Sequence, residues 1–338
     1  MPDFCKQDGF VWVDIFAFLC HNKENYSYNR CRGKQSFEGW VYMTDKLQIA
    51  GDRIPKVLFI GNGLLQLAGG DHWGKLLSAI SVRNMEGSAL QGIPYAMRPE
   101  VLCGVDAEEV QRKTAAAITE SDIHPLLQKL LDMPFDAVIT TNYTYEIERA
   151  LSAKAWTDYQ RRKTFCTLHG SGNVRDNTCM CNLIRTSSGK TIPVFHIHGE
   201  RSRKHSLVLS YYSYAKAVAK LHALNKERGD QYREKQIEAK EIEVWSWLDY
   251  FILGDVYSVG FGFDLSEFDL WWALERKARE KARHGKTRLY MIQSKDACLP
   301  QATMAEALGA EMQRFDIADG SYLQAYERVV NTIEENMR

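Results

Sequence analysis

Short apolar runs alternate with longer helical stretches along this chain, and this pattern limits its fold more than any other feature. Each run holds about four to six residues, the length of a strand that is buried on both faces of a parallel sheet. Helical stretches between such runs are typical of an open α/β layer fold. The pattern therefore predicts a parallel sheet flanked by helices. The expected strands cover residues 57–60, 137–140, 194–197, 207–209, 256–259 and 289–292.

Two long helical stretches interrupt the strand pattern. Residues 73–133 have a mainly helical pattern that Pro94 and Pro99 break, and residues 214–247 carry a dense mixture of charges. Opposite charges three or four residues apart are typical of a solvated helix face. We expect both stretches to be helical insertions within one domain, which spans residues 56–338 and follows an N-terminal extension over residues 1–55.

Charge and cysteine usage disfavour several classes of protein. The 338 residues include 43 Lys+Arg and 43 Asp+Glu, so the formal net charge is zero and gives no general basic field for nucleic acid. Basic clusters at 161–163 and 201–205 lack interleaved aromatic residues. No apolar run approaches the ~18 residues of a membrane span, and residues 3–8 lack a signal-peptide pattern. With 8 scattered Cys, we expect a cytoplasmic protein with reduced thiols and no membrane contact.

The first glycine-rich turn, Gly61-Asn62-Gly63, follows the apolar run 57–60. Two glycines here let the backbone turn tightly and approach a phosphate beside the start of the next helix. The dinucleotide fingerprint expects a third glycine where this chain has Gln66, and no acidic residue ends an obvious second strand. The motif therefore disfavours an ordinary hydride-transfer enzyme. A plain strand-to-helix turn is the alternative interpretation.

Three polar residues, Thr140, Thr141 and Asn142, come at the end of the second apolar run. Asn142 has the chemistry of a positioning residue, because a neutral amide accepts from a ribose hydroxyl or water and donates to a developing charge without titrating. The alternative is that Thr141 or Asn142 caps the next helix, whose first N–H groups need polar partners.

Two histidines end the third apolar run. His196 and His198 are two residues apart, so on a strand they would share a face. His198 lies beside Gly199, which leaves room for a ligand, and imidazole is the natural general base near neutral pH. A structural histidine is the alternative. His169, in an expected loop rich in Gly, Asn and Ser, is the second candidate base.

The last glycine turn, Gly260-Phe-Gly262-Phe-Asp264, follows the fifth apolar run, at the strand end where open sheets place their ligand crevice. Asp264 could bind a ribose, although an acidic residue in a turn often has only a turn role. Ser266 and Asp269, three residues apart, predict a capping box at the start of the next helix.

Taken in order, Gly61-Asn62-Gly63, Thr140-Thr141-Asn142-Tyr143, His198-Gly199 and residues 259–264 resemble the motif series of sirtuin-like proteins, particularly the bacterial sirtuin-like domains of antiphage defence systems. The ordered set is more specific than any one motif and spans residues 57–292. The resemblance implies a Rossmann-like NAD-binding sheet with a helical insertion module. It also implies an NADase, a hydrolase that converts NAD⁺ to nicotinamide and ADP-ribose.

The resemblance assigns roles by position. Asn142 and His198 match the catalytic residues of the family, NAD is expected as the substrate, and no metal is expected. A homo-oligomer is expected as well, and a partner protein of a defence complex is a further candidate. The residues assigned to NAD binding are Gly61, Asn62, Gly63, Thr141, Gly199, Gly260, Gly262 and Asp264.

The chain departs from the family pattern at two places. Thr144 stands where the family has Asp, and Asn142-Tyr143-Thr144 also fits a related abortive-infection family that shares the His-Gly-Glu segment. Cys166, Cys179 and Cys181 do not form the paired Cys-x-x-Cys knuckles of deacylating sirtuins, which disfavours zinc and protein deacylation. The alternative function is a non-catalytic NAD or ADP-ribose sensor or assembly module.

Overall fold

The computed structural model describes most of the chain after residue 46. Of the predicted N-terminal extension, residues 1–55, the first 46 residues lie outside the described residues. The described ranges are 47–51, 53–70, 72–82, 90–157, 165–168, 177–228, 241–280, 285–293, 299–317 and 321–338.

In the described ranges, eight strands form the main sheet: β2 (Lys56–Ile60), β3 (Ala137–Thr140), β4 (Phe165–Thr167), β5 (Met180–Arg185), β6 (Thr191–His196), β8 (Asp255–Val259), β9 (Thr287–Ile292) and β10 (Glu311–Phe315). Their order is β10-β9-β8-β2-β3-β6-β5-β4. Neighbours from β10 to β6 are parallel, whereas β5 pairs antiparallel with β6 and β4. The predicted α/β fold, a Rossmann-like and mostly parallel sheet flanked by helices, is confirmed.

The central strands alternate their side chains between two hydrophobic cores. In β2, Val57 and Phe59 belong to one core, whereas Leu58 and Ile60 belong to the other. All four side chains are fully buried, which explains the unbroken apolar run in the sequence. Helices α10 (Trp247–Leu253) and α11 (Phe268–Arg279) contribute to the first core, and α5 (Pro125–Leu131), α6 (Glu146–Leu151) and α13 (Tyr322–Met337) contribute to the second.

The helical stretch after β2 forms a module with a small core of its own. Its helices are α2 (Trp73–Ile80), α3 (Arg98–Cys103) and α4 (Ala107–Ala117), with the 3₁₀ turn η3 (Tyr95–Met97) before α3. Leu207 and Leu209 belong to this core. The strand predicted over residues 207–209 is therefore wrong, because these apolar residues pack under the module instead of joining the sheet.

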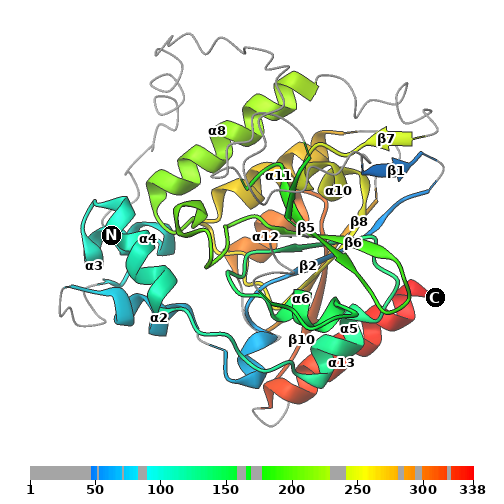
Figure 1. The fold of residues 1–338 in the computed structure, drawn as a ribbon, viewed down its shortest axis with the longest axis horizontal. Helices are drawn as coiled ribbons and strands as arrows, with labels where there is room; N and C mark the ends of the chain where they lie inside the picture. Colours follow the sequence, from blue (N-terminus) through cyan, green and yellow to red (C-terminus); the bar gives the residue numbers. More distant parts are fainter. Residues whose placement is uncertain are drawn as a thin grey trace, which may run out of the picture. The chain divides into compact units, whose positions relative to one another are not determined.

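The remaining elements lie around these layers. Helix α8 (Tyr211–Arg228) runs beside α11 (Figure 1), and β1 (Gln48–Ala50) pairs antiparallel with β7 (Glu241–Glu243). Helix α12 (Pro300–Ala307) precedes β10. Among the helices of the described ranges, none combines the length and apolarity needed to cross a bilayer.

The strand order reverses between β2 and β8. From β2 the chain builds β3 and then β6 on one side, and it later returns to build β8, β9 and β10 on the other. Open parallel sheets bind their ligands outside the carboxyl ends of the strands at such a switch point. The two glycine turns predicted from the sequence follow these two strands.

Candidate active site

A cavity of about 870 Å³ lies at the carboxyl ends of the parallel strands. Its wall combines the turns after β2, β3 and β8 with residues of the helical module, α8 and α13. Gly61 and Gly199, two of the predicted site residues, are not part of this wall. The predicted residues that line the cavity are Asn62, Gly63, Thr141, Asn142, His198, Gly260, Gly262 and Asp264.

Backbone hydrogen bonds join the two glycine turns at the cavity. The Gly61 N–H donates to the Val259 carbonyl at 2.9 Å, and the Gly63 N–H donates to the Gly260 carbonyl at 2.8 Å. A Cβ on Gly61 would lie only 2.5 Å from the Gly260 oxygen, and Gly260 itself has φ of 68°. The helix expected after Gly63 is a single 3₁₀ turn, η1 (Leu65–Ala68), so this turn presents no α-helix N-terminus to a phosphate.

Asn142 is held at the end of β3 by its own side chain and backbone. Its Nδ2 donates to the Gly61 carbonyl at 3.3 Å, and its N–H donates to Thr140 Oγ1 at 3.0 Å. Helix α6 begins at Glu146, so neither Thr141 nor Asn142 caps it and the capping alternative is wrong. In the described ranges no residue hydrogen-bonds Asn142 Oδ1, which leaves this acceptor for a ligand.

His196 supports Asn142 from the side of α6. Its Nδ1 lies 2.6 Å from the Asn142 carbonyl oxygen, and its Nε2 lies 2.6 Å from Glu148 Oε1. Burial alone would lower the pKa of His196, but the Glu148 charge and hydrogen bond overcome it and raise this pKa to about 9. At neutral pH the imidazolium therefore donates from both nitrogens. Sequence reasoning gave His196 no role, because nothing in the sequence indicated Glu148 as its partner.

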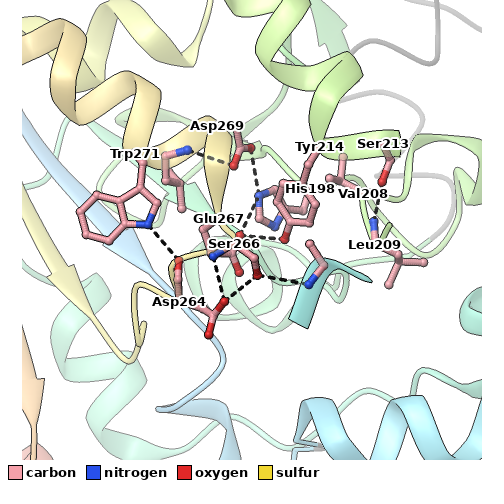
Figure 2. Close-up of polar contacts among 12 residues, drawn as sticks. His198, Val208, Leu209, Ser213, Tyr214, Asp264, Ser266, Glu267, Asp269 and Trp271 are labelled. Carbon is pink, nitrogen blue, oxygen red and sulfur yellow. Dashed lines mark hydrogen bonds and ion pairs between the residues drawn. The ribbon is translucent and has the colours of Figure 1, made fainter. Parts of the chain in front are cut away.

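His198 contacts residues of α8 and of the start of α11 (Figure 2). Strand β6 ends at His196, so the two histidines do not share a strand face as expected. The Nε2 of His198 lies 3.1 Å from Asp269 Oδ2 and 3.6 Å from Glu267 Oε2. Burial opposes the charged imidazole, but Asp269 and Glu267 raise the pKa of His198 overall.

Glu267 is the second carboxylate beside His198. Tyr214 of α8 donates its hydroxyl to Glu267 Oε2 at 2.7 Å, and its ring meets the His198 ring edge-on with centroids 5.3 Å apart (Figure 2). Burial raises the pKa of Glu267 to about 7. Sequence reasoning missed both Glu267 and Tyr214. The acidic pair two residues apart, Glu267 and Asp269, was the available signal, whereas Tyr214 had none.

The predicted capping box at Ser266 and Asp269 is not formed. Helix α11 has Glu267 at its N-cap and no side-chain cap bond. The Ser266 hydroxyl donates to Asp264 Oδ1 and accepts from the Ala96 N–H at 3.1 Å, which ties the last glycine turn to the helical module (Figure 2). The Asp269 carboxylate is committed to His198 instead.

His198, Glu267 and Asp269 also have ligand types that suit a divalent cation. They are the one such group that the described residues contain, with ligand atoms all within 4.8 Å of one another. A cation here would occupy the Nε2 of His198. The absence of a metal therefore stays a prediction from the sequence.

Arg98 places a permanent positive charge at the cavity wall. It is the sole Lys or Arg among the described residues that line the cavity. Its guanidinium carbon lies 3.8 Å from the centre of the Tyr95 ring, and its Nε donates to the Ile93 carbonyl at 3.0 Å. These two contacts restrain the guanidinium, a group whose planar set of donors suits an anionic ligand.

The chain matches no protein-family model, and no curated protein matches it. The resemblance to sirtuin-like defence proteins therefore depends on the ordered motifs alone. His169, the second candidate base, lies outside the described residues.

Proposed function

We propose that this protein is an NAD⁺ hydrolase that cleaves the bond between nicotinamide and ribose, releases nicotinamide and ADP-ribose, and acts in antiphage defence by NAD depletion. One observation carries the proposal: Asn142 and His198, which follow the ends of β3 and β6, line a single cavity together with both glycine turns. The resemblance assigns this same set of residues to NAD⁺ hydrolysis. The cavity of about 870 Å³ is within the usual range for small-molecule sites, ~300–1,000 Å³.

The reaction needs little acid catalysis. The ring nitrogen of NAD⁺ carries the positive charge, so nicotinamide departs with the bonding electrons as a neutral molecule. What must be stabilised is a cationic sugar, and what must be positioned is a water molecule. The acidic side chains of Asp264 and Glu267 line the cavity, and in their ionised forms they favour positive charge there.

Asn142 and His198 supply the remaining chemistry of the proposal. The Asn142 amide orients the ribose or the attacking water, and the supports at Gly61 and His196 hold it in place. The water oxygen bonds to the ribose carbon as nicotinamide leaves. His198 accepts a proton from that water or from a ribose hydroxyl and passes it to solvent.

Nicotinamide release tests the proposal. Full-length wild-type protein, Asn142→Ala and His198→Ala are incubated with NAD⁺ over a range of protein concentrations, because an oligomer could be required for activity. We expect release by the wild type alone. Asn142→Ala should keep the circular dichroism of the wild type, whereas His198→Ala leaves the Asp269 carboxylate buried without its partner and should have a lower thermal midpoint. Full activity in Asn142→Ala contradicts the proposal. Calorimetric binding of NAD⁺ without release supports the non-catalytic sensor instead.

A further inference from the structure

We infer that Asp269 is a positioning residue for His198: it holds the imidazole proton on Nε2 and so leaves Nδ1 as the base that meets the substrate. The catalytic part of this inference rests on the proposed NAD⁺ hydrolysis. The positioning part concerns the resting protein and can be tested without any activity.

The Asp269 carboxylate is fixed by contacts at both of its oxygens. Its Oδ2 lies 3.1 Å from His198 Nε2, and its Oδ1 accepts from the Leu270 N–H at 2.9 Å (Figure 2). The side chain is 2% exposed, so water does not compete for these bonds. Asp269 also lies in the first turn of α11, where the helix dipole favours a negative charge.

An ionised carboxylate can only accept hydrogen bonds, so the His198 nitrogen that faces it must carry the proton. In the neutral imidazole the other nitrogen, Nδ1, then has the free lone pair. No residue in the described part of the chain hydrogen-bonds Nδ1, and the His198 side chain lines the cavity. A base oriented by a third group is the general arrangement of activated hydrolytic sites.

Glu267 has a different place in the same cluster. It lies 3.6 Å from His198 Nε2, its side chain is 17% exposed, and it accepts a shorter bond from Tyr214. Two other titratable groups act on this cluster: the Asp264 charge raises the pKa of Glu267, and Tyr143 has its own pKa raised by burial, as does Tyr214. Both tyrosines therefore stay neutral. The shorter and better buried contact identifies Asp269 as the residue that orients the ring.

Nitrogen-15 NMR of the imidazole tests the positioning role directly. Full-length protein labelled at its histidines is studied at a pH where His198 is neutral, and its signals are identified by their loss in His198→Gln. We expect a protonated, pyrrole-type Nε2 and an unprotonated, pyridine-type Nδ1. In Asp269→Asn the amide can donate to Nε2, so the proton should move to Nδ1. A wild-type proton on Nδ1, or an unchanged spectrum in Asp269→Asn, overturns the inference.

Kinetics then test the catalytic consequence. General base catalysis contributes about 10²–10⁴-fold, so Asp269→Asn should lower kcat for nicotinamide release by about that factor and leave KM within a few-fold. Asp269→Glu should recover part of kcat. The matched control is Asp255→Asn, at the opposite end of β8, where the carboxylate bonds the Lys286 N–H. This control should keep wild-type activity.

The outcomes separate the inference from the proposed function. Expected NMR signals in a protein that releases no nicotinamide uphold the positioning and reject the hydrolase. Nicotinamide release by Asp269→Asn at the wild-type rate overturns the inference and leaves the hydrolase standing. Loss of wild-type activity in EDTA, restored by Zn²⁺ or Mn²⁺, overturns it too, because the cluster would then hold a cation in place of the Nε2 proton.

Discussion

Removing the buried imidazolium beneath Asn142 should strongly destabilise the protein. The side chains of His196 and Glu148 are 1% and 0% exposed, and their atoms approach to 2.6 Å. In His196→Leu, Glu148 Oε1 keeps only the Asn182 amide at 3.0 Å, and Oε2 has no partner among the described residues. Breaking a buried ion pair on one side costs about 3–5 kcal/mol, a large part of the stability of a typical domain.

The same pair predicts the pH dependence of stability. The pKa of His196 is about 9 in the folded protein, whereas an unperturbed histidine has a pKa of 6.5. Each pKa unit corresponds to about 1.4 kcal/mol, so the raised pKa stabilises the folded protein by roughly 3 kcal/mol. Because the folded pKa is the raised one, this stabilisation is complete below pH 6.5. It is lost as the pH rises through about 9.

Urea unfolding at pH 6, pH 7.5 and pH 9.5 measures both effects. Wild type should lose free energy of unfolding toward pH 9.5. His196→Leu should be less stable at pH 6 and should lose less with rising pH, because only the raised pKa of His198 then remains from the two histidines. The double variant His196→Leu/Glu148→Leu should recover most of the loss, because neither member of this pair is left as a buried charge without its partner. A single variant that costs under about 1 kcal/mol, as exposed ion pairs do, refutes this reasoning. So does a loss of stability with rising pH that is as steep in His196→Leu as in the wild type.

Further predictions concern the cavity wall. Arg98→Ala should raise KM for NAD⁺ by about tenfold or more with little change in kcat, since a hydrogen bond to a charged group is worth about 1.5–3 kcal/mol; initial rates over NAD⁺ concentration measure it. Gly61→Ala should destabilise by about 1–3 kcal/mol because its Cβ meets backbone, whereas Gly262→Ala, with open space around it, should be tolerated in the same thermal melts. Nicotinamide release should increase with pH as His198 loses its proton, and Glu267→Gln should move the midpoint of that rise to lower pH, because one of the carboxylates that raise the His198 pKa is gone.

The sequence predicts those strands whose side chains are buried on both faces of the sheet. Strand β2 is buried on both faces, so every residue from Val57 to Ile60 had to be apolar and the strand could be recognised. Strand β10 has no fully buried residue, and it left no such run. The run 207–209 was misassigned because apolarity reports burial and does not tell a sheet from a helical core.

In the site, the sequence predicts the residues that follow strand ends and does not predict their partners from distant parts of the chain. Turns after strands converge at one sheet edge, which is why Asn142 and His198 could be placed together. Asp269, the partner of His198, lies 71 residues further along the chain, and Tyr214 belongs to a different helix. The spacing of Ser266 and Asp269 suggested a local cap, whereas tertiary contacts use both side chains for other bonds.

The central claim is that water cleaves NAD⁺ in this cavity, and the products formed in water labelled with heavy oxygen (¹⁸O) test it most directly. Wild-type protein should release nicotinamide and ADP-ribose in equal amounts, with one labelled oxygen on the ribose carbon that held nicotinamide. Asn142→Ala, equally folded, should release neither. Intact NAD⁺ at every concentration of wild-type protein, with calorimetric binding retained, would contradict the account and leave a sensor of the nucleotide in its place.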